Sequence, residues 1–181
     1  MRILPKELPH FETLKKLARK YPQIDPSASE TFIYLISMCH KLLVAGDAHF
    51  AEFGISQGRF TVLMLLMKAE EPGLSPSELA EKAGVSRATM TGLVDGLEKD
   101  GFIERHQSPN DRRGIVINLT EKGRGFLDHM LPTHFERIAK IMEPLSDVER
   151  GQLKILLQKV EQGLSIFQVN TNEIIEREAE V

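Results

Sequence analysis

Two helix-start signals lie close together in the middle of the chain, separated by a glycine turn. Residues 75–78 (Ser-Pro-Ser-Glu) combine a capping serine, a proline at the first helical position and a glutamate at the third. The helix they open is short, because residues 83–85 (Ala-Gly-Val) form a tight turn. Ser86 then caps a second helix that extends to Asp100 and ends at Gly101. This order predicts two short helices joined by a turn.

A β-hairpin follows the second helix directly. Residues 102–105 (Phe-Ile-Glu-Arg) and 115–119 (Ile-Val-Ile-Asn-Leu) are short strand-like segments on either side of the polar turn SPNDRRG. A helix, a turn, a capped helix and a hairpin in this order predict a winged helix-turn-helix. The fold class is therefore mainly α with a small β-hairpin wing (α+β).

Long helices are expected on both sides of this unit. Residues 27–30 have capping-box spacing and open a helix to about Glu52, and a third capping box at residues 146–149 opens a helix with an apolar stripe from Leu153 to Phe167. The helix between Thr120 and Met142 is expected to kink at Pro132. The predicted segments are a basic N-terminal extension (1–26), a first dimerisation helix (27–55), the winged helix-turn-helix (56–122), C-terminal dimerisation helices (123–170) and an acidic tail (171–181).

Composition places the chain among ordinary globular proteins. Its 181 residues are 41% hydrophobic and 27% charged, which argues against wholesale disorder, and one cysteine excludes a disulfide framework. The net charge of −3 decides nothing about DNA, because residues 75–125 carry eight basic and eight acidic side chains. We expect no membrane span and no signal peptide, and hence a cytoplasmic protein.

The second short helix and the wing carry the side chains expected to bind DNA. The first turns of the helix are small or hydrogen-bonding, and an arginine there can donate two hydrogen bonds to guanine. Arginines at a hairpin tip are suited to a narrow minor groove. The predicted DNA-binding residues are Ser86, Arg87, Thr89, Met90, Thr91, Arg105, Arg112 and Arg113.

Residues 30–167 resemble the MarR family of bacterial transcription regulators. The resemblance is densest over residues 74–127, where Asp111-Arg112-Arg113 and the following LTEKG match the family's wing signature. It implies a dimer joined by its first and last helices, with Arg113 or Arg112 in the minor groove. It also implies that Asp95 steadies a wing arginine, so Asp95 and Asp111 are the expected wing supports.

The basic N-terminal extension is similar to that of a family subgroup that responds to urate. This chain departs from that subgroup, because it has no tryptophan, and Thr61 and Gly92 stand where an acidic residue and an arginine would be. The departures argue against urate as the effector.

A small-molecule effector is nevertheless expected between the dimer helices and the winged helix. The candidate lining residues are apolar with one titratable group, which suits a small aromatic or phenolic acid. They are His40, Phe60, Met64 and Met67. The regulator is expected to be a homodimeric repressor at a palindromic operator, with two recognition helices about 34 Å apart.

Other function classes fit the sequence less well. No phosphate loop or nucleophile elbow is present, so no catalytic residue and no cofactor are expected. Cys39, His40 and His49 share a helix, but the two histidines point to opposite sides, so no metal site is expected. Two alternatives stay open, namely a redox-responsive regulator that senses through Cys39 and a winged helix that binds proteins instead of DNA.

Overall fold

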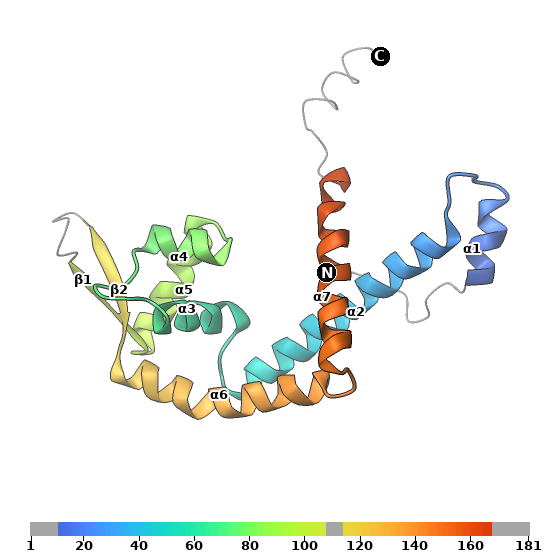
Figure 1. Ribbon diagram of the computed structural model, residues 1–181. Coiled ribbons are helices and arrows are strands. Elements are labelled where there is room, and N and C mark those ends of the chain that lie inside the picture. Colours follow the sequence, from blue (N-terminus) through green and yellow to red (C-terminus); the bar gives the residue numbers. More distant parts are fainter. Residues whose placement is uncertain (1–10, 108–113, 168–181) are drawn as a thin grey trace, which may run out of the picture. The chain divides into compact units, whose positions relative to one another are not determined.

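The computed structural model describes residues 11–107 and 114–167. Figure 1 shows helices throughout, with one antiparallel hairpin of two strands. The elements are α1 (Phe11–Ala18), α2 (Pro26–Glu52), α3 (Gln57–Met67), α4 (Pro76–Ala83), α5 (Arg87–Lys99), β1 (Ile103–Gln107), β2 (Ile115–Leu119), α6 (Glu121–Met142), α7 (Asp147–Gln162) and the 3₁₀ turn η1 (Leu164–Phe167).

The winged helix-turn-helix begins and ends where its capping residues predict. The Ser75 hydroxyl accepts from the Glu78 backbone amide while the Glu78 carboxylate accepts from Ser75, which completes a capping box at α4. Hydrogen bonds from the Ser75 hydroxyl and amide hold the pKa of the Glu78 carboxyl below its usual value. Gly84 ends α4 with a φ of 65°, a conformation that glycine adopts without steric cost.

One expected helix start is displaced by two residues. Asp25 caps α2 by accepting from the backbone amides of Ser27 and Ala28, and Pro26 occupies the first turn. The spacing of residues 27–30 resembles a capping box. Proline is favoured at the first position of a helix, however, and Pro26 occupies that position directly after the Asp25 cap. The helix therefore begins at Pro26, earlier than expected, and it ends at Glu52 as expected.

The core of the winged helix is formed by α3, α4, α5 and the hairpin, which Figure 1 shows gathered together in green and yellow. Ile103 pairs with Leu119 across the hairpin, and Leu74 forms a bridge to Ile117 that adds a short third segment. The side chains that are fully buried here come from every one of these elements. They include Val62, Leu63, Leu79, Met90, Val94, Leu97 and Ile117.

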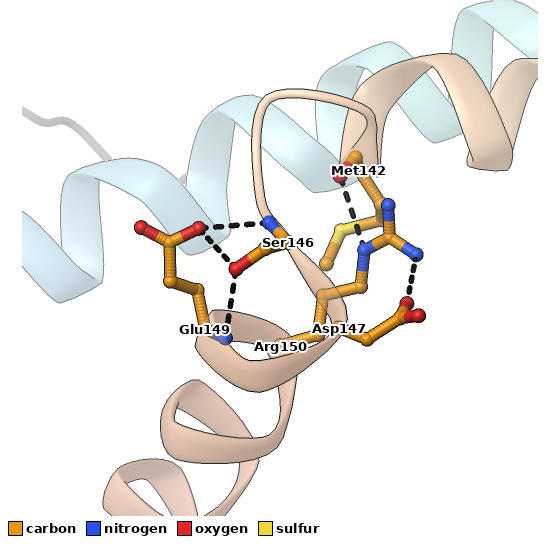
Figure 2. A network of polar contacts seen from close by, with 5 residues as sticks. All are labelled: Met142, Ser146, Asp147, Glu149 and Arg150. Carbon is orange, nitrogen blue, oxygen red and sulfur yellow. Dashed lines mark hydrogen bonds and ion pairs between the residues drawn. The ribbon is translucent and has the colours of Figure 1, made fainter.

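The chain divides into two compact units, residues 1–128 and 129–181, so the winged helix lies in the first. In the second unit the turn before α7 is held by polar contacts (Figure 2). Ser146 and Glu149 form a capping box, and Arg150 donates to the Met142 carbonyl at 3.2 Å and to Asp147 at 3.0 Å. The box predicted at residues 146–149 is confirmed.

Two long helices expose much of their apolar surface. Phe50 is the buried residue of α2, and none of the residues of α7 is buried. By length and composition α2 could also cross a membrane, a test that helices of soluble proteins pass as well. The exposed apolar side chains of α2 and α7 include Phe32, Ile36, Leu42, Leu43, Leu153, Leu156, Leu157 and Val160.

Candidate nucleic-acid interface

The N-terminal half of α5 exposes polar side chains, while apolar residues of the same helix are buried in the core. Ser86 caps the helix, and its hydroxyl lies 2.9 Å from that of Thr89. The Thr91 hydroxyl donates to the Arg87 carbonyl at 2.9 Å and keeps its lone pairs for further acceptance. The Arg87 side chain is exposed, and no residue of the described chain forms an ion pair with it. Its five donors are thus available to a ligand.

Met90 does not belong to this surface. Its side chain is fully buried, as are those of Val94 and Leu97, which lie four and seven residues further along α5. Residues at this spacing share one helix face, and this face packs on the core. The prediction that Met90 contacts DNA is therefore wrong, because position 90 has the phase of the anchoring residues.

Arg105 lies on β1 and bonds to two acidic residues of α5. Its Nη2 contacts Asp95 and its Nη1 lies 2.9 Å from Glu98, while its own side chain is 32% exposed. The hairpin is thereby held against the C-terminal half of α5. The charge of Arg105 is used within the protein, where it neutralises two carboxylates that would otherwise repel a phosphate backbone.

A second arginine approaches α5 from α3. Arg59 Nη1 donates to Asp100 at 2.8 Å, and its guanidinium also lies against Gly96. Sequence reasoning did not single out this group. A glycine inside a helical pattern was the available signal, since such a residue often marks a close approach.

Comparison with known proteins identifies the family. The MarR family model matches residues 55–115. The transcriptional repressor YetL of Bacillus subtilis is 39% identical over 162 residues, which cover 90% of this chain and 97% of YetL. The chain belongs to the MarR family. This family consists of transcriptional regulators, so the sequence-based identification is confirmed.

Solved structures of MarR-family regulators share the fold. Sco3205 from Streptomyces coelicolor, solved in complex with DNA, is 25% identical with a TM-score of 0.67 and covers 76% of this chain and 88% of its own. CouR from Rhodococcus jostii RHA1, bound to p-coumaroyl-CoA, is 26% identical with a TM-score of 0.62, covering 74% and 92%. The winged helix-turn-helix prediction is confirmed.

The wing tip of this MarR-family chain lies outside the described residues. Asp111, Arg112 and Arg113 belong to that segment, so their predicted roles stay predictions. Asp95 was expected to steady a wing arginine, and the arginine that it contacts here is Arg105, at the base of the wing.

The four predicted effector residues lie on two helices of the MarR-family fold. Phe60, Met64 and Met67 follow one another along one side of α3, and His40 is half-buried on α2. Phe60 is only 8% exposed and stacks on Phe50 at a centroid distance of 4.9 Å, so it joins α3 to α2. Met64 is half-buried and Met67 is exposed.

Two further predictions concern metal binding and the single cysteine of this MarR-family chain. Within residues 11–107 and 114–167 no group of three or more His, Cys, Asp or Glu side chains could hold a metal ion. Cys39, the residue of the redox-responsive alternative, is exposed on α2. The exposed position follows from the large unburied face of this helix.

Proposed function

We propose that this MarR-family chain is a homodimeric, ligand-responsive repressor that binds double-stranded DNA at a palindromic operator. The observation that carries this proposal is the exposed Arg87, which forms no ion pair within the described residues and lies in the first turn of a helix that Met90, Val94 and Leu97 anchor on the core. YetL is named a repressor and Sco3205 was solved with DNA, which supports the same function here.

In this proposal α5 is the recognition helix, and it and the wing would contact different grooves of the DNA. Ser86, Arg87, Thr89 and Thr91 would face base edges in the major groove, with Arg87 donating to guanine. Arg112 and Arg113 would enter the minor groove next to it. Sequence preference would then come from α5, while the wing adds affinity through charge.

A second copy of the chain would cover the apolar faces of α2 and α7. The exposed apolar surface on each of these helices is unfavourable in a monomer, and a homodimer is typical of the family. The segment boundaries predicted from the sequence assign both helices to dimerisation. In this proposal a partner helix covers α2 instead of a lipid bilayer, and the protein acts in the cytoplasm by binding, without catalysis.

A small aromatic or phenolic acid would act as effector beside α3. Met64 and Met67 supply apolar surface, Phe60 an aromatic wall and His40 a titratable group that can pair with a carboxylate. CouR was solved with p-coumaroyl-CoA, which supports this ligand class. Such a ligand needs only about 1.4 kcal/mol of preference for one state to change DNA affinity tenfold.

Selection of bound duplexes from a random pool tests DNA recognition. We expect enrichment of a palindrome whose half-sites are one helical turn apart, and an affinity that falls steeply with salt. Equal retention of all duplexes would contradict sequence-specific binding. Loss of retention at every salt concentration would favour a winged helix that binds proteins.

Calorimetry with benzoate, salicylate and hydroxycinnamates tests the effector. We expect one of these to bind and to release the enriched duplex in the same buffer. His40→Ala is expected to weaken that binding, with His129→Ala on α6 as the control. Binding that leaves DNA affinity unchanged would contradict a regulatory role.

A further inference from the structure

Arg59 joins α3 to the C-terminal end of the recognition helix. Its Nη1 lies 2.8 Å from an oxygen of Asp100, the residue that caps α5. The two side chains are 30% and 42% exposed, so solvent screens their attraction. An ion pair of this exposure contributes little to stability, whereas its geometry can still fix an angle between helices.

Gly96 is the second part of this contact. A Cβ added at Gly96 would overlap the guanidinium of Arg59, so any larger residue there would displace the arginine. Glycine inside a helix is less favourable than alanine. On the other helix, a Cβ at Gly58 would lie 3.2 Å from Leu93 of α5. Two glycines, one on each helix, thus let α3 and α5 approach closely.

The contact lies at the C-terminal end of α5, so a small change of helix angle there displaces the residues at the N-terminal end that are proposed to face DNA. Thirteen residues form α5, and at a rise of 1.5 Å per residue they span about 20 Å. A tilt of about 5° at the C-terminal end would therefore move Arg87 by about 2 Å over that length. A displacement of this size is enough to lose a hydrogen bond to a base.

We propose that Arg59 is a positioning residue for DNA recognition, held by Gly96 and Asp100, which sets the angle of the recognition helix without touching DNA. This inference rests on the proposed function. Phe60, the neighbour of Arg59, stacks on Phe50 of α2, so the orientation of α5 follows that of α3 and α2. Arg59 and Phe60 of α3 thus connect α2 to α5, the helix that carries the proposed DNA-binding residues.

The test uses the full chain and two probes, a duplex enriched from a random pool by the unaltered protein and a random-sequence duplex. We expect Arg59→Lys and Gly96→Ala each to lower affinity for the enriched duplex about fivefold, the upper end of what an ion pair of this exposure contributes. Affinity for the random duplex should stay within about twofold, because it depends on phosphate contacts that Arg59 does not make. Arg150→Lys changes an Arg–Asp ion pair on α7 and should alter neither affinity.

A double variant tests the contact itself. Gly96→Ala displaces an arginine, so it should cost no further affinity when Arg59→Ala has already removed that arginine. Circular dichroism and thermal unfolding confirm that each variant is folded. Arg59→Lys keeps the charge but loses the planar guanidinium, and it carries the test if Arg59→Ala does not fold.

Each remaining outcome overturns the proposal. Folded variants with an unchanged ratio of the two affinities would show that Arg59 does not position α5. An equal loss on both duplexes would assign Arg59 to phosphate binding or to the fold alone. If the unaltered protein enriches no duplex, the proposed function itself fails, and this inference fails with it.

Discussion

Arg87 and Arg105 differ in what surrounds their charge. Arg105 is held by Asp95 and Glu98, whereas Arg87 has no ionic partner in the described chain. A guanidinium without a partner gains the most from a phosphate or a base edge. At the residue scale, therefore, burial and pairing decide which side chains can recognise DNA.

Arg87→Ala should weaken binding to the enriched duplex by about 1–3 kcal/mol, or about 5- to 150-fold, and relax preference at one position per half-site. The reason is the loss of a bidentate base contact. Competition binding with single-base variants of the duplex measures both effects. Lys99→Ala, at the other end of α5, is the control, and an unchanged preference in Arg87→Ala would mean that another surface reads the sequence.

Arg113→Ala should weaken enriched and random duplexes by the same factor and lower the slope of log affinity against log salt by about 1. A wing arginine contributes charge near the phosphates more than base contacts. Salt titrations of both duplexes provide the measurement, with Lys140→Ala on α6 as a charge-matched control. A loss confined to the enriched duplex would instead make Arg113 a sequence-reading residue.

Met90→Ala should lower the free energy of unfolding by about 2–5 kcal/mol, because it opens a cavity among fully buried side chains. Thermal or urea unfolding measures this change. The exposed Met67→Ala should cost much less. A small effect for Met90→Ala together with weaker DNA binding would restore Met90 to the DNA-binding surface.

At the scale of elements, capping residues explain where helices begin. The Ser146 hydroxyl and amide donate to Glu149 and hold the pKa of that carboxyl below its usual value. Because the folded pKa is the lower one, this contribution to stability is fully present above the unfolded pKa of about 4.3 and is lost as pH falls through the folded value.

Ser146→Ala should return the pKa of Glu149 toward its usual value and reduce the stability of α7 above about pH 4.3. Carbon-detected NMR titration of the Glu149 carboxyl measures the shift. Ser77→Ala, at an exposed position inside α4, is the control. The same Glu149 pKa in unaltered and Ser146→Ala protein would show that the capping box is not formed in solution.

Most element boundaries could be predicted because the responsible signals are local. Serine caps at positions 56, 75, 86 and 146 all begin helices, and Gly84 ends one. The start of α2 was misplaced because two acceptable caps compete within three residues, and the proline at position 26 decides between them.

At the scale of the whole molecule, the proposed dimer buries the apolar faces of α2 and α7 that are exposed in the single chain. Removing residues 145–181 should convert the dimer to a monomer, because the deletion takes away all of α7. Sedimentation at micromolar concentration measures the change. A deletion of residues 1–10 serves as the control, and a dimer that persists without α7 would place the interface elsewhere.

The sequence by itself determined the winged helix-turn-helix, its family and the helix that is proposed to face DNA. These depend on caps, glycine turns and apolar periodicity, which act over a few residues. Only the tertiary structure decided which side chains of that helix are available. Met90 is buried because its side of α5 packs on the core. Arg105 of β1 forms an ion pair with Asp95 of α5. Arg59 donates a hydrogen bond to Asp100, which lies 41 residues further along the chain. Contacts between elements depend on packing that no local sequence pattern encodes. The partner of each arginine is therefore known only from the folded chain.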